Sequence, residues 1–197
     1  MGREIRGLHP RGDGLFLIFT ETTLKGAYLV APEGITDERG FFARSWCEKE
    51  FRALGLAPRI VQCSISYNRM QGTLRGMHYQ VPPFEEEKLV RCTRGSIHDV
   101  IIDLRHDSKS FGKHFGVTLT AENRTMVYIP KGFAHGFLTL EDDTEIFYQM
   151  SEFYAPECGR GVRWNDPSFG IEWPGEVRIL SEKDRSYPDF DPKKIGN

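Results

Sequence analysis

The chain has 197 residues, of which 39% are hydrophobic and 27% are charged, and its formal net charge is -2. This length fits one domain, residues 1–197, that can bury a full core. Lys and Arg are spread along the chain, so the charge indicates neither a nucleic-acid partner nor a membrane surface. The N-terminal MGREIRGLHPRGDG has no apolar secretory segment, and we expect a cytoplasmic protein.

The first apolar stretch, LFLIF at 15–19, predicts a strand or core segment and is far too short to span a bilayer. Residues 44–56, RSWCEKEFRALGL, interrupt the strand pattern. Cys47, Phe51 and Leu54 recur there at helical spacing and Gly55 can end the segment, which predicts a short helix. The four cysteines form no CxxC pair, so reduced thiols are favoured over a zinc or redox site.

Between residues 88 and 150, short stretches rich in Val, Ile, Phe and Tyr alternate with turn signals about every ten residues, which is typical of an antiparallel sandwich or barrel. Periodicity alone leaves an immunoglobulin-like sandwich, a jelly roll and a closed barrel open. From residue 165 onward proline and glycine recur, so roughly the last thirty residues should wrap the surface with little regular structure.

The segment LRGMHYQ at 74–80 raises a question about His78. Strand alternation puts His78 and Gln80 on one face and Arg75 on the other. A face that carries both His and Gln is not pure core, although a lone histidine is more often a partly buried structural residue.

Four further residues are weak candidates one by one. Lys88 suggests a solvated strand end, His135 a loop histidine between glycines, Tyr148 a core tyrosine with one hydrogen bond, and Asp166 an Asx-turn before proline. Together with His78 they are the groups needed for proton transfer beside a carbonyl, namely a base, a cation for the enolate oxygen and a weak acid.

A metal site is disfavoured by the spacing of the histidines. No H-x-H occurs, and His98, His106 and His114 are each eight residues apart, which is about 26 Å of strand. We therefore expect no metal.

The sequence resembles the dTDP-4-dehydrorhamnose 3,5-epimerase family, which has a jelly-roll, cupin-like fold. The resemblance rests on ordered motifs that run from about residue 24 to 190: DERGFFARSW (37–46), GTLRGMHYQ (72–80), KLVRCTRGSIHDVIIDLR (88–105), FGKHFGVTLTAENRTMVYIPKGFAHGFLTL (111–140), YQMSEFYAPECGRGVRWNDPSFGIEWP (148–174) and LSEKD (180–184). It implies an all-β antiparallel sandwich or barrel with a few short helices, an N-terminal strand segment and a wrapping C-terminal tail.

The resemblance also implies roles. His78 would be the general base, Asp166 would pair with its imidazole, Tyr148 would be the acid on the opposite face of the sugar, and Lys88 the cation near the C4 oxygen. The implied contacts to the nucleotide sugar are Arg39, Phe42, Gln62, Arg75, Gln80, His135 and Tyr154. Because Arg75 and His78 have opposite parity on an ideal strand, a bulge or a twist at Gly76 would let both reach one ligand.

The implied reaction is cofactor-independent epimerisation at C3, C5 or both of a 4-keto-6-deoxy nucleotide sugar. The implied assembly is a homodimer with exchanged N-terminal strands. Thymidine-specific members usually carry Glu at Arg44 and Asn at Ser64, so Arg44 should either point to solvent or meet a base carbonyl or phosphate. The alternatives are a related epimerase for another nucleotide sugar, a non-catalytic sugar-nucleotide binder and a metal-dependent cupin.

Overall fold

The computed structural model describes residues 4–6, 15–57 and 59–194, and most of its regular structure is β. The described strands are β1 (Glu4–Arg6), β2 (Phe16–Glu21), β3 (Tyr28–Asp37), β4 (Gly40–Ala43), β5 (Gln62–Asn68), β6 (Leu74–Gln80), β7 (Lys88–Arg94), β8 (Ser96–Asp103), β9 (His114–Thr120), β10 (Met126–Ile129), β11 (Phe133–Thr139), β12 (Thr144–Met150) and β13 (Gly159–Gly161). The described helices are α1 (Glu48–Ala53), α2 (Glu182–Arg185) and two 3-10 turns, η1 (Pro156–Cys158) and η2 (Pro192–Lys194).

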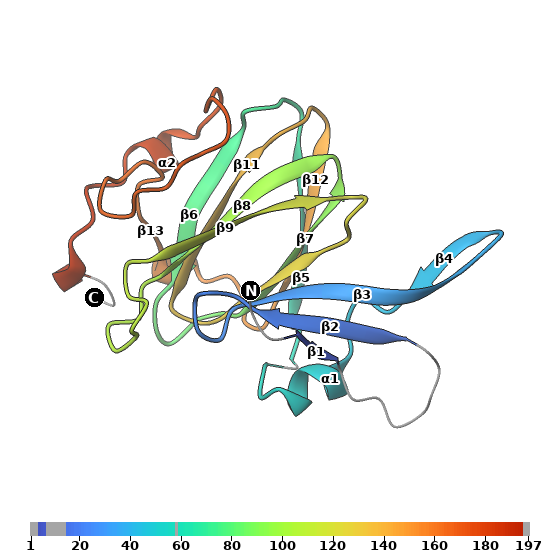
Figure 1. The fold of residues 1–197 in the computed structure, drawn as a ribbon. Coiled ribbons are helices and arrows are strands. Elements are labelled where there is room, and N and C mark those ends of the chain that lie inside the picture. Colours follow the sequence, from blue (N-terminus) through green and yellow to red (C-terminus); the bar gives the residue numbers. More distant parts are fainter. Residues whose placement is uncertain (1–3, 7–14, 58, 195–197) are drawn as a thin grey trace.

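The strands form two sheets (Figure 1). The larger has the order β1-β2-β3-β10-β7-β12-β5, with β4 paired to β3, and the smaller has the order β13-β6-β11-β8-β9. Neighbouring strands in both sheets are antiparallel. The predicted all-β antiparallel fold with a few short helices is therefore confirmed.

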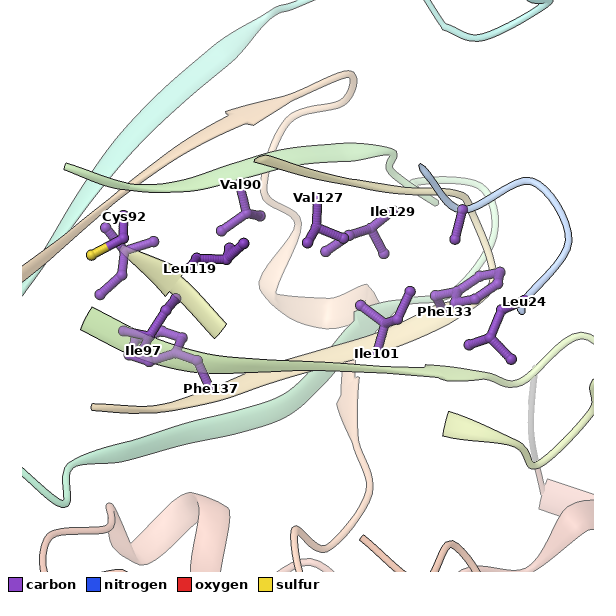
Figure 2. Packing of buried hydrophobic residues seen from close by; sticks show 12 residues of the cluster. Leu24, Val90, Cys92, Ile97, Ile101, Leu119, Val127, Ile129, Phe133 and Phe137 are labelled. Carbon is purple, nitrogen blue, oxygen red and sulfur yellow. The ribbon is translucent and has the colours of Figure 1, made fainter. Parts of the chain in front are cut away.

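The main core lies between the two sheets. Alternation turns Val90 and Val127 of the larger sheet toward Ile97, Ile101 and Phe137 of the smaller one, as Figure 2 shows. These side chains are at most 1% exposed. Burying each of them contributes about 1.5–3 kcal/mol relative to leaving it exposed, so this layer holds the two sheets together.

The short helix predicted within residues 44–56 is confirmed as α1. Phe51 is 1% exposed and its ring meets that of Phe19 edge to face, with centroids 5.2 Å apart, so the helix packs on the N-terminal strands. Gly55 has a φ of +70°, and its N–H donates to the carbonyl of Arg52. A residue without a Cβ adopts this left-handed conformation readily, which is why the helix ends there.

Arg44 takes neither of the two places expected for it. Its Nη1 donates to the carbonyl of Leu15 at 2.8 Å and to Glu50 Oε1 at 3.1 Å. Glu50 is fully buried and also accepts from the N–H of Leu17 at 2.9 Å. A buried carboxylate requires a partner of opposite charge, and Arg44 supplies it. The guanidinium thus ties the start of β2 to α1 within its own chain.

The C-terminal tail wraps the outer face of the smaller sheet, as predicted. Phe169, Ile171 and Trp173 pack on Val100 and neighbouring residues of that sheet. Apart from α2 and η2 the described part of the tail after residue 165 has little regular structure, and Figure 1 shows it in red beside β6 and β13. No helix among the described residues is long and apolar enough to cross a membrane.

Candidate active site

A pocket of about 700 Å³ opens between the two sheets, where β5, β6, β7, β11 and β12 meet residues 179–184 of the tail. Both sheets and the tail contribute polar side chains to it. Seven of the residues predicted from the sequence line this pocket: Gln62, Arg75, His78, Lys88, His135, Tyr148 and Tyr154.

His78 enters the pocket from β6 and is held by a carboxylate of the tail. Its Nε2 lies 2.6 Å from Asp184 Oδ1, and the side chains of His78 and Asp184 are 41% and 5% exposed. A neutral imidazole donates from one ring nitrogen and accepts at the other. With Nε2–H donating to Asp184, Nδ1 is the nitrogen that can accept a proton.

Asp184 is placed by a local feature of the tail. Ser181 is the N-cap of α2, and its Oγ accepts from the N–H of Asp184 at 3.1 Å. The carboxylate also accepts from the N–H of Gly76 at 3.4 Å. Burial alone would raise the pKa of Asp184, but the hydrogen bond and charge of His78, the N–H of Gly76 and the side chain of Ser181 hold that pKa below its ordinary value. Asp184 is therefore an ionised partner for the imidazole.

The predicted pairing of Asp166 with His78 is wrong. Asp166 is 2% exposed, its Oδ1 accepts from the N–H of Ser168 at 2.9 Å, and its Oδ2 accepts from the N–H of Phe190 at 2.6 Å. These two donors lower the pKa of Asp166 against the rise that burial alone would cause. The carboxylate forms an Asx-turn and fastens two segments of the tail, and Asp166 does not line the pocket.

A second histidine–carboxylate pair lies deeper. His135 Nε2 is 2.7 Å from Asp99 Oδ2, and the two side chains are 5% and 1% exposed. Asp99 Oδ1 is buried and accepts no hydrogen bond from the described part of the chain. The Tyr148 ring centroid is 6.1 Å from that of His135, so the buried negative charge lies close to the phenol.

Tyr148 enters from β12 of the larger sheet, opposite His78. Burial raises the pKa of Tyr148 well above its ordinary value, and the charge of Asp99 adds to the rise, while Arg75 and the Ser66 hydroxyl oppose it. The phenol is therefore protonated at neutral pH and can act as a proton donor.

Of the bulge or twist expected at Gly76, the structure shows a shift of register of the bulge kind. On β11, Phe137 and His135 are two residues apart, but their partners on β6, Arg75 and His78, are three apart. The extra residue on β6 changes the parity of the strand, so both side chains line the pocket. Asn68 accepts from Arg75 Nε at 2.8 Å and fixes the guanidinium at the pocket wall.

Gln80 was expected to contact the ligand, but this expectation is wrong because the side chain is 4% exposed and does not line the pocket. Its Nε2 donates to the carbonyls of Phe84 and Phe153, and its Oε1 accepts from the N–H of Ala155 at 2.7 Å. Gln80 thus holds the loop that carries Tyr154. Tyr154 lines the pocket and is 57% exposed. Its backbone N–H donates to Gln62 Oε1 at 3.3 Å.

Arg39 and Phe42 lie on the β3–β4 hairpin, outside the pocket of their own chain. The hairpin extends away from the two sheets in Figure 1. Arg39 pairs with Asp37, and Phe42 is 70% exposed.

Three carboxylates near the pocket had no role in the sequence-based prediction: Asp184, Asp99 and Glu86. Signals for two of them exist in the sequence. Asp184 stands three residues after Ser181, the spacing of a helix N-terminus, and Asp99 lies on the inward face of β8 between Ile97 and Ile101, where a carboxylate requires a buried partner. Among the described residues, no three His, Cys, Asp or Glu are grouped so that they could hold a metal ion.

Comparison with known proteins gives a family match over most of the chain. Residues 21–192 match the family described as dTDP-4-dehydrorhamnose 3,5-epimerase. The chain belongs to this family. The dTDP-4-dehydrorhamnose 3,5-epimerase of Methanothermobacter thermautotrophicus is 45% identical over 172 residues, which cover 86% of this chain and 92% of that protein.

Solved structures of dTDP-4-dehydrorhamnose 3,5-epimerases superimpose on the fold. The enzyme of Elizabethkingia anophelis NUHP1 has a TM-score of 0.87 at 39% identity and covers 92% of this chain and 99% of its own. That of Bacillus anthracis strain Ames, with TDP and PPi bound, has a TM-score of 0.85 at 41% identity and covers 88% of this chain and 99% of its own. The fold is therefore cupin-like, and this member of the epimerase family is an isomerase.

Proposed function

We propose that this epimerase inverts C3, C5 or both of a 4-keto-6-deoxy nucleotide sugar, of the dTDP-4-dehydro-6-deoxy-D-glucose type, through an enolate. The observation that carries the proposal is that His78 and Tyr148 enter one pocket from opposite sheets. A sugar ring between them would meet a base on one face and a proton donor on the other. Removal and return of a proton on opposite faces inverts a carbon.

In the first step His78 takes the proton from a carbon beside the C4 ketone. Its Nδ1 is the accepting atom, because Nε2–H donates to Asp184. The ionised carboxylate keeps the ring oriented and stabilises the imidazolium that forms. The electron pair of the broken C–H bond passes into the enolate, whose negative charge develops on the C4 oxygen.

The enolate oxygen needs a hydrogen-bond donor with positive charge. Lys88, at the start of β7, lines the pocket and pairs in register with Met150, two residues beyond Tyr148 on β12. Side chains two apart on a strand share a face, so the ammonium of Lys88 is on the same inner face as the phenol. Arg75 and His135 add further donors at the wall. Tyr148 then protonates the carbanion from the other side.

The test of the proposal is isotope exchange in D2O with dTDP-4-dehydro-6-deoxy-D-glucose and its CDP, GDP and UDP counterparts. Deuterium should appear at C3, C5 or both with at least one of them, together with the inverted product. Binding of the nucleotide sugar without exchange would instead identify a non-catalytic binder.

Asp184→Asn should lower kcat by about 10- to 100-fold, because an amide can neither hold the imidazole in the same tautomer nor stabilise the imidazolium. Asp166→Asn should leave kcat within about threefold, because the carboxylate of Asp166 accepts its hydrogen bonds from Ser168 and Phe190 of the tail and does not line the pocket. Single-turnover kinetics and thermal unfolding of both variants check this. Equal losses of kcat in the two folded variants would contradict the assignment of Asp184.

We also propose that the enzyme works as a homodimer in which the β3–β4 hairpin of one copy covers the pocket of the other. Ile35 and Phe42 are cross-strand partners on the hairpin and are 52% and 70% exposed. At the pocket, β5 is the edge strand of the larger sheet and exposes Ile65 at 65% and Tyr67 at 48%. An open edge strand and a projecting apolar hairpin are complementary surfaces.

Ile35→Ser/Phe42→Ser is expected to convert the dimer to a monomer in sedimentation equilibrium and to lower kcat/KM at least tenfold, since two apolar anchors are lost. Arg39→Ala is the matched control on the same hairpin: it should remain dimeric and raise KM alone. A monomeric wild type with full activity would contradict the proposed exchange.

For the location we propose the cytoplasm. Cys47, Cys63, Cys92 and Cys158 are all unpaired. A reducing compartment keeps thiols in this state.

A further inference from the structure

In the pocket Lys88 forms an ion pair with Glu86, a carboxylate that has no part in the steps above. Glu86 Oε1 lies 3.0 Å from Lys88 Nζ, and the two side chains are 10% and 14% exposed. Both residues line the pocket, together with His78 and Tyr148. This nearly buried carboxylate lies beside the cation that would meet the substrate ketone, so it can affect how Lys88 reacts with that ketone.

A buried lysine beside a ketone can react in two ways. As an ammonium it donates hydrogen bonds to the carbonyl oxygen. As a neutral amine it adds to the carbonyl carbon and, with loss of one water molecule, forms an imine. Burial in a pocket favours the neutral amine, and an opposite charge at hydrogen-bond distance favours the ammonium. The position of Glu86 therefore bears on which of the two chemistries Lys88 performs.

We propose that Glu86 is a positioning residue that holds Lys88 as an ammonium donor at the substrate carbonyl and prevents it from forming an imine. The inference rests on the proposed function for the identity of the ketone, but the contact between Glu86 and Lys88 is independent of it. Glu86 also fixes the end of a flexible four-carbon side chain, so the donor is already in place when the enolate forms.

Two neighbouring residues supply controls. Glu85 is in the same loop and does not line the pocket, so Glu85→Gln removes the same charge without touching Lys88. Lys183, on α2, lines the same pocket and is an internal reference for access by a reagent.

The first experiment uses pyridoxal phosphate, a small aldehyde that forms imines with neutral amines, followed by borohydride reduction and peptide mass spectrometry. In Glu86→Gln the labelling rate of Lys88 should rise about tenfold over that of the wild type and of Glu85→Gln. The rate at Lys183 should be the same in all three proteins. An unchanged labelling rate at Lys88 in folded Glu86→Gln would overturn the proposal, whether or not the enzyme turns over any sugar.

The second experiment measures turnover of the keto sugar. Glu86→Gln should lower kcat about tenfold with KM within about threefold, because the hydrogen bond from the Lys88 ammonium stabilises the enolate-like transition state more than the bound substrate. Glu86→Asp should recover part of kcat, since it keeps the charge. If the wild type turns over and Glu86→Gln matches it, the inference about Glu86 fails while the proposed function stands. If the wild type shows no turnover, the proposed function fails and the labelling result alone decides the role of Glu86.

Discussion

His78→Asn is expected to lose deuterium uptake and product formation together, by about 10²- to 10⁴-fold. Asparagine can still donate to Asp184, but its amide cannot take a proton from carbon. Because the His78 side chain is 41% exposed and lines the pocket, the smaller polar replacement should lower the stability of the fold only slightly. The measurement is exchange by NMR in D2O beside a thermal unfolding curve.

The matched control is His114→Asn. His114 is on β9, and its Nδ1 is 2.9 Å from the carbonyl of Phe169 in the tail, away from the pocket. This variant should keep the wild-type exchange rate. Persistent deuterium uptake in folded His78→Asn would show that another group removes the proton, and the assignment of His78 would then be wrong.

The strands and the short helix could be predicted from the sequence because their signals are local, whereas the choice of a jelly roll among the all-β folds depended on the family resemblance. Alternation, turn residues and the Cys47, Phe51 and Leu54 spacing each describe a few neighbouring residues, and the structure reproduces the strands and α1. An irregularity at Gly76 could also be predicted from the parity of Arg75 and His78, but the sequence left open whether it would be a bulge or a twist.

The partner of His78 could not be predicted in this way. His78 and Asp184 are 106 positions apart in the chain, and no alternation on β6 says which tail carboxylate reaches it. Asp166 is also a carboxylate in the tail, but the backbone N–H groups of Ser168 and Phe190 donate to its two oxygens. Which of two carboxylates is free for a histidine depends on how the tail crosses the sheet, and that is a property of tertiary packing.

The partner of Arg44 could not be predicted from the sequence for the same reason. A guanidinium in place of a carboxylate suggested an altered contact to a base or phosphate, but Glu50, six residues later, accepts from it inside the chain. Since Glu50 is fully buried, the pair is explained by the packing of α1. The charge reversal at Arg44 is therefore no evidence for a nucleotide other than dTDP.

Tyr148→Phe should separate the two halves of the reaction. The phenol is on the sheet opposite His78, and its raised pKa keeps the proton on oxygen at neutral pH. Without it, His78 can still remove a proton and return a deuteron to the same face, so exchange should persist within about tenfold of the wild type. Inverted product should fall by about 10²- to 10⁴-fold, because the donor on the other face is gone.

The measurement is the ratio of deuterium uptake to epimer formed, taken from the same NMR sample over time. Tyr128→Phe is the matched control: Tyr128 is 5% exposed in the N-terminal core, and its hydroxyl accepts only from the N–H of Ala57 in the described structure, at 3.1 Å. That variant should lose some stability and keep the wild-type ratio. In Tyr148→Phe the ratio should rise at least tenfold, since a base on one sheet and an acid on the other act in separate steps. A parallel loss of uptake and inversion would mean that the phenol is needed before the proton leaves carbon, for instance to orient the ketone, and the division of roles between the two sheets would be wrong.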